Sequence, residues 1–73
     1  MSQVTVTPEL ATRWAQWLAQ IIAVNKGSHL ADERRALLER INNIRDTGGT
    51  LELTDREVAR TRQYAPIYKL IQQ

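Results

Sequence analysis

The sequence predicts an all-α protein, a small helical domain with an N-terminal antiparallel helix hairpin and a third helix that a proline interrupts. Three observations favour this class. Residues 8–24 and 30–45 each place apolar side chains at helical spacing on one face. Glycines follow both segments, where helices commonly end. Residues 54–57 have the spacing of a capping box, which predicts the start of a third helix.

The first helix is expected to begin at Pro8. Thr7 can cap free backbone N–H groups, and proline is preorganised for the first helical position. The apolar face of this helix comprises Leu10, Trp14, Trp17, Leu18, Ile21 and Ile22. Its two tryptophans are interpreted as core anchors, with partial exposure in a binding groove as the alternative. Lys26 and Gly27 are expected to end the element, with Gly27 in a left-handed backbone conformation.

The second helix is expected after a turn at residues 25–28. Ser28 can cap it, and Asp32 and Glu33 stand near its positive end. Arg45 lies near its negative end, and Gly48-Gly49 is expected to stop it. A short turn between two amphipathic helices predicts that they pack side by side in opposite directions.

Two arginines, Arg34 and Arg45, interrupt the apolar stripe of the second helix. That stripe consists of Leu30, Leu37, Ile41 and Ile44, with Leu38 to one side. One interpretation is that the arginine stems cover apolar surface while each guanidinium reaches water. The other is that the pair contacts an acidic partner, which makes both arginines candidate partner-binding residues.

The third helix is expected to start after Thr54, whose hydroxyl and the Glu57 carboxylate can cap one another's backbone N–H groups. Pro66 removes a donor, so the element is expected either to break into two short helices or to kink there. Residues 50–73 are expected either to pack on the hairpin or to stay partly mobile, with the last turn fraying.

Residues 3–6 and 50–53 alternate between apolar and polar side chains, which is typical of strands. An optional two-stranded ribbon follows from this pattern, with extended coil as the alternative. A ribbon of two strands is marginal unless it packs against helices. The whole chain, residues 1–73, is expected to form one domain.

Composition favours a folded, non-catalytic protein. Apolar residues make up 42% of the chain and charged residues 25%, which is typical of a globular domain rather than a disordered segment. Without cysteine there is no thiol chemistry, and the reducing cytoplasm is the simplest compartment. His29 is interpreted as a solvated first-turn residue, and Gly48-Gly49 lacks the Lys-Ser/Thr of a phosphate loop. We therefore expect no enzyme activity, no metal and no cofactor.

The C-terminal part of the chain is basic, because no acidic side chain follows Glu57. Its basic and aromatic candidates for partner binding are Arg60, Arg62, Tyr64, Tyr68 and Lys69. The formal net charge of +2 is too small to indicate a polyanion binder by itself. On a continuous helix, Arg62 and Lys69 would share a side while Arg60 would lie opposite Arg62, so these charges form no single stripe.

Two stretches of this part resemble small phage helix-turn-helix and excisionase-like regulators. Residues 53–60, Leu-Thr-Asp-Arg-Glu-Val-Ala-Arg, resemble the first helix of the motif. Residues 67–71, Ile-Tyr-Lys-Leu-Ile, resemble the end of its recognition helix. The resemblance implies a small DNA-binding regulator, which is the alternative function. The usual turn is absent, since only residues 61–66 intervene and none is glycine.

The whole chain is similar in length, lack of cysteine and mildly basic helical character to small phage-encoded transcription antiterminators of the Xanthomonas phage type. The resemblance implies a regulator that binds host RNA polymerase at the amino-terminal part of its β′ subunit, near the RNA exit channel. It also implies inhibition of initiation and read-through of terminators. No residue role is carried over, because the resemblance rests on general character rather than on a motif.

Overall fold

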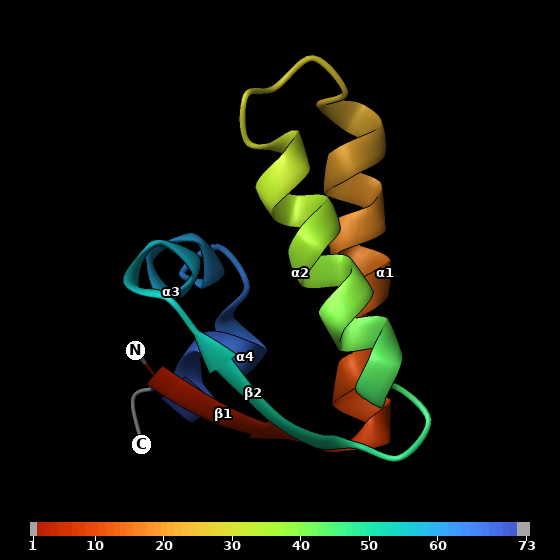
Figure 1. Ribbon diagram of the computed structural model, residues 1–73, viewed down its shortest axis with the longest axis vertical. Helices are drawn as coiled ribbons and strands as arrows, with labels where there is room; N and C mark the ends of the chain where they lie inside the picture. Colours follow the sequence, from red (N-terminus) through yellow and green to blue (C-terminus); the bar gives the residue numbers. More distant parts are fainter. Residues whose placement is uncertain (1, 72–73) are drawn as a thin grey trace.

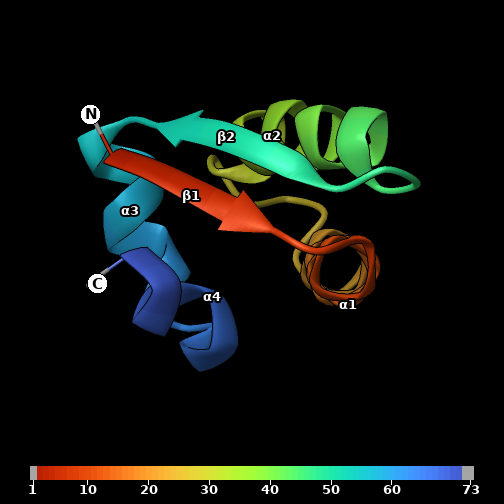
Figure 2. The same cartoon turned by 90° about the horizontal axis from the view of Figure 1, so that it is seen from below.

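The computed structural model describes residues 2–71, in which two strands combine with helices. The elements follow in the order β1 (Ser2–Val6), α1 (Pro8–Val24), α2 (Ala31–Ile44), β2 (Gly49–Leu53), α3 (Asp55–Thr61) and α4 (Ala65–Ile71). The long helices α1 and α2 lie side by side, and the strands with α3 and α4 gather beside one end of that pair (Figures 1 and 2). Among the described residues, none of the helices is long and apolar enough to cross a lipid bilayer.

The predicted all-α class is wrong, because an antiparallel sheet of β1 and β2 joins the four helices of the described part of the chain. The register pairs Val4 with Leu51 and Thr5 with Thr50. Along each strand the burial alternates, so that one face of the ribbon is covered and the other faces solvent. Helices pack on the covered face, with α4 and α1 against β1 and α2 and α3 against β2. This packing is what makes a two-stranded ribbon stable here.

The start of α1 is confirmed, and the turn that follows α1 differs from the prediction. The backbone N–H of Leu10 donates to the Thr7 hydroxyl at 3.2 Å, with Pro8 as the first helical residue. Gly27 does not adopt the predicted left-handed conformation. The Ser28 hydroxyl accepts from the N–H of Leu30 at 3.1 Å, but α2 begins only at Ala31, since Ser28 stabilises the turn before the helix.

The predicted stop of α2 at Gly48 is confirmed. Its N–H donates to the carbonyl of Ile44 at 2.7 Å, and its φ of 72° lies in the left-handed region. A Cβ at this position would approach the Val6 carbonyl oxygen to 2.9 Å. Gly48 therefore does two things: it ends α2, and it lets the chain pass close to the junction of β1 and α1.

Gly48→Ala is expected to lower the free energy of unfolding by about 1–3 kcal/mol, because a methyl group there meets both an unfavourable φ and the Val6 carbonyl. The measurement is urea unfolding followed by circular dichroism. The control is Gly27→Ala, where a Cβ meets nothing within 4 Å and the effect should stay within about 1 kcal/mol. Equal effects of the two substitutions would contradict the role given to Gly48.

The third predicted helix is broken rather than kinked. Its capping box is confirmed, since the N–H of Glu57 donates to the Thr54 hydroxyl at 3.2 Å and the N–H of Thr54 to the Glu57 carboxylate at 3.0 Å. α3 ends at Thr61 and α4 begins at Ala65, so Pro66 falls in a first helical turn, where its missing N–H costs nothing.

The core lies where the ribbon meets α1, α2 and α4. Its fully buried large side chains are Trp14, Ile41, Leu53, Ile67 and Val4. Leu53 and Ile67 place β2 and α4 within this core. Partial mobility of residues 50–73 stays a prediction, and residues 72 and 73 lie outside the described part.

Candidate docking site between the first three helices

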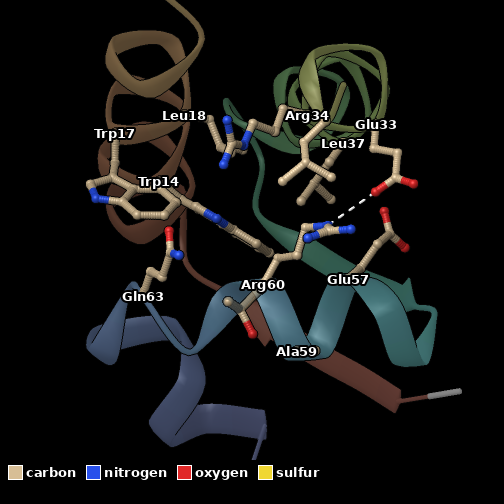
Figure 3. Close-up of a pocket in the computed structure, with 12 residues that line it drawn as sticks. Trp14, Trp17, Leu18, Glu33, Arg34, Leu37, Glu57, Ala59, Arg60 and Gln63 are labelled. Atoms are coloured by element: carbon tan, nitrogen blue, oxygen red, sulfur yellow. Dashed lines mark hydrogen bonds and ion pairs between the residues drawn. The ribbon is translucent and has the colours of Figure 1, made fainter. Parts of the chain in front are cut away.

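A hollow of about 150 Å³ lies between α1, α2 and α3, and we call it the α1–α2–α3 hollow (Figure 3). Its walls include Trp14, Trp17 and Leu18 from α1, Arg34 and Leu37 from α2, and Arg60 from α3. The apolar walls come from the faces that the helical periodicity predicts to be inward. The charged ones come from the edges of α2 and α3 that face one another.

The two tryptophans take different places in this hollow. Trp14 is fully buried, as the core interpretation predicts. Its indole Nε1–H has no hydrogen-bond partner among the described residues. Trp17 is only half-buried and stacks on Tyr64 from the turn before α4, with ring centroids 5.0 Å apart and an angle of 14° between the planes. Trp14 therefore forms part of the core, and Trp17 forms a partly exposed wall of the hollow.

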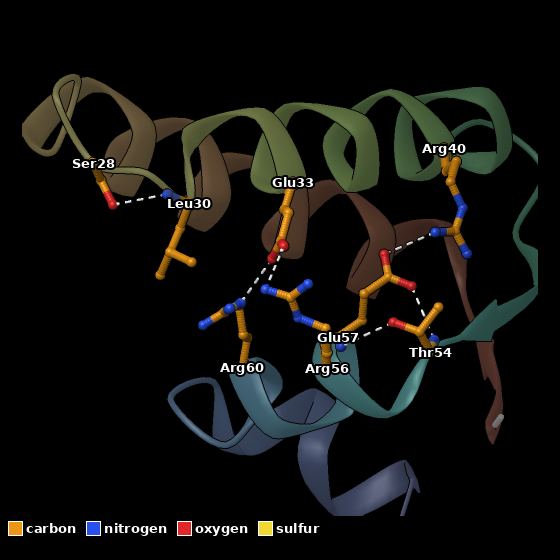
Figure 4. A network of polar contacts seen from close by, with 8 residues as sticks. All are labelled: Ser28, Leu30, Glu33, Arg40, Thr54, Arg56, Glu57 and Arg60. Carbon is orange, nitrogen blue, oxygen red and sulfur yellow. Dashed lines mark hydrogen bonds and ion pairs between the residues drawn. The ribbon is translucent and has the colours of Figure 1, made fainter.

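A network of ion pairs ties α2 to α3 along one side of the hollow (Figure 4). The Glu33 carboxylate of α2 forms ion pairs with two guanidinium groups from successive turns of α3. Its oxygens lie 2.9 Å from a nitrogen of Arg56 and 3.0 Å from a nitrogen of Arg60. Glu57 of α3 pairs with Arg40 of α2 at 2.8 Å. The Arg40 guanidinium also donates to the backbone carbonyl of Glu52. Both carboxylates that line the hollow are thus already engaged by arginines.

Arg34 differs from these arginines. Its half-buried side chain points into the hollow toward the indoles of α1 (Figure 3). Among residues 2–71, no carboxylate oxygen lies within 4.0 Å of its guanidinium. Of the charged side chains that line the hollow, Arg34 and Arg60 face Glu33 and Glu57. Arg40 and Arg56 lie outside the lining but pair with these same carboxylates. Arg34 is thus the lining charge that has no ion-pair partner among the described residues.

The structure brings some of the predicted partner-binding residues together and separates others. Arg34 and Arg60 both line the hollow, and Tyr64 reaches its edge through the stack on Trp17. Arg45 lies at the C-terminal end of α2, beside Asn42 and Gln16 in a different depression, and its Nε is 3.9 Å from Asp46. The other three predicted residues, Arg62, Tyr68 and Lys69, do not line the hollow. The Arg62 guanidinium lies 5.9 Å from the centroid of the Tyr68 ring, a cation–π contact, and Lys69 is exposed.

Sequence reasoning missed Glu33 and the donor of Trp14 as parts of a site. Glu33 was interpreted only as a charge near the positive end of a helix. Its partner Arg60 lies 27 residues away, and no local pattern predicts that pairing. One signal was present, since Arg56 and Arg60 are spaced by one helical turn and can therefore reach the same carboxylate.

The composition of the hollow's lining resembles that of recognition pockets. Apolar and aromatic walls combine with a few N–H donors, which is the usual composition of a recognition pocket. Within the described part of the chain, no group of three or more His, Asp or Glu side chains could hold a metal ion. His29 lies exposed in the turn before α2 and does not line the hollow.

Comparison of the chain with protein-family models, with curated proteins and with solved structures found no match. α3 and α4 have seven residues each and are joined by residues 62–64. The resemblance of this segment to helix-turn-helix regulators, and that of the whole chain to phage antiterminators, stay predictions.

Proposed function

We propose that this chain is a non-catalytic regulator that acts by docking the α1–α2–α3 hollow on an acidic surface of a larger protein. The observation that carries the proposal is the position of Arg34, unpaired and half-buried beside Trp14 and Trp17. Arginine and tryptophan are the residues most enriched where binding energy concentrates in protein interfaces. A partner carboxylate would pair with Arg34, which has no carboxylate partner among residues 2–71.

The partner that we propose is bacterial RNA polymerase of a phage host, in the amino-terminal region of its β′ subunit. Support for this choice is the resemblance of the whole chain to small phage antiterminators. The regulator would then act in the host cytoplasm, where it would inhibit initiation and promote read-through of terminators. Binding through protein contact needs no substrate, cofactor or metal.

Immobilised protein is expected to retain purified bacterial RNA polymerase in the absence of DNA. Arg34→Ala should weaken retention by at least about tenfold, as removal of a central arginine anchor commonly does. The matched control is Arg45→Ala on the same helix, which removes an arginine outside the hollow and should change retention less than about threefold. Surface plasmon resonance of both variants measures the difference.

A small DNA-binding regulator is the second candidate, supported by the α3–turn–α4 arrangement with exposed Arg62 and Lys69. Two other arginines of α3 are less available to phosphates, because Glu33 holds both of them. The same surface-resonance experiment separates the two functions. Failure to retain polymerase would contradict the first proposal, whereas binding to duplex DNA that falls steeply with salt would support the second.

A further inference from the structure

We infer that the α1–α2–α3 hollow is a specific pocket for one acidic side chain, an aspartate or glutamate presented by a segment of the partner protein. Its carboxylate would accept from the Trp14 indole Nε1–H and from the Arg34 guanidinium. This inference rests on the proposed function, because it specifies which chemical group of a partner the hollow recognises. The inference itself rests on three independent properties of the hollow: a buried donor, a local charge and a volume.

The buried donor is Trp14 Nε1–H. Trp14 is fully buried, yet this N–H has no acceptor among the described residues. A buried donor without an acceptor costs folding free energy, so nearly all such groups in native proteins are paired. The indole lines the hollow, but its Nε1 exposes almost no surface. An acceptor in the hollow therefore reaches this N–H only when the neighbouring side chains move aside.

The charge around the hollow selects an anionic acceptor over a neutral one. Glu33 and Glu57 are the carboxylates of the lining, and each is engaged by arginine at 3.0 Å or less. Arg34 has no such partner in the described part of the chain and points into the same space (Figure 3). Hydrogen bonds from a guanidinium to a carboxylate are about twice as strong as those between neutral groups.

The volume limits the occupant to about one side chain. A hollow of about 150 Å³ is comparable to a cavity that accommodates benzene. Pockets for whole metabolites or cofactors are usually larger, about 300–1,000 Å³. Trp17 and Leu30 line the hollow as apolar walls, against which the methylene groups of an acidic side chain can lie.

The test uses propionate, which reproduces the end of a glutamate side chain, and propionamide, its neutral counterpart. The full chain is labelled with ¹⁵N, and the indole N–H signal of Trp14 is assigned with Trp17→Phe, which leaves a single indole. Propionate is expected to shift the Trp14 signal with a dissociation constant of about 1–10 mM, the range open to so small a ligand. Propionamide should bind at least about tenfold more weakly.

Arg34→Gln should weaken propionate binding by at least about tenfold, since it replaces the charged donor by a neutral one. Arg35→Gln is the matched control, because that neighbouring arginine is exposed and pairs with Asp32 at 3.3 Å. It should leave the titration unchanged. Thermal unfolding of both variants verifies that they are folded.

Three results would overturn the inference: no shift of the Trp14 signal at about 100 mM propionate, an equal response to propionamide, or an unchanged titration of Arg34→Gln. The first result would mean that the hollow holds only water. Retention of polymerase together with any of these would leave the proposed function intact. Propionate binding as expected, without retention of polymerase, would support the pocket and overturn the proposed partner.

Discussion

Trp14→Ala is expected to lower the free energy of unfolding by about 3–5 kcal/mol, the range typical of removing a buried aromatic side chain. A domain of 73 residues has about 4–11 kcal/mol in total, so this variant should lose a large part of its stability and should be unfolded if the parent lies at the lower end of that range. The loss is expected to be large because Trp14 is fully buried within the core cluster, so its removal leaves a cavity there. Urea unfolding followed by circular dichroism measures the loss.

Two further substitutions make the Trp14 experiment specific. Val24→Ala removes apolar volume from the end of α1, but Val24 is 81% exposed, and the change should stay within about 0.5 kcal/mol. Trp14→Phe keeps most of the buried volume and removes the unpaired N–H together with part of the indole ring, so it should cost clearly less than the alanine variant. A loss below about 1 kcal/mol for Trp14→Ala would contradict the packing described for the core.

Leu53→Ala is expected to lower the free energy of unfolding by about 2–5 kcal/mol. Leu53 ends β2, and its side chain is fully buried between the ribbon and the helices. Chemical denaturation gives the value, with Glu52→Ala as the matched control. Glu52 precedes Leu53 on the same strand, but its side chain lies on the exposed face, where it accepts a hydrogen bond from Gln3 at 3.3 Å. Losing that exposed contact should cost less than about 0.5 kcal/mol.

The Leu53 variant also decides between the two expectations for residues 50–73. If this segment is packed in solution, the alanine substitution destabilises the whole domain in one cooperative transition. A loss of less than about 0.5 kcal/mol would instead indicate that β2, α3 and α4 detach easily from the helix hairpin. In that case the α1–α2–α3 hollow would be an intermittent feature, and Arg34 would lie on an open helix face.

The starts of α1 and α3 and the stop of α2 could be predicted, because local chemistry specifies them. Thr7 and Thr54 cap the helices that follow them, and Gly48 ends α2 in the left-handed conformation that the sequence indicates. The local predictions that were wrong lie in the turn before α2. The Ser28 hydroxyl accepts from the N–H of Leu30 within the turn and does not cap the helix, so α2 starts only at Ala31.

The fold class was wrong because it depends on contacts between elements that are distant in the sequence. The alternation of residues 3–6 and 50–53 was visible, but a ribbon of two strands gains its stability from what covers it. Periodicity shows which face is apolar and does not show which helices will cover that face. Burial of Val4 and Leu51 beneath four helices is a property of the tertiary structure.

The sequence by itself determined where α1 and α3 start and marked the two segments that form strands, because caps, prolines and periodicity act over a few residues. Only the tertiary structure decided the site. It placed Glu33 between Arg56 and Arg60, which neutralised part of a tail that is basic in sequence. It also brought the unpaired Arg34 and the Trp14 donor to one hollow. Such convergence depends on how distant elements pack, and no short-range pattern in the chain encodes it.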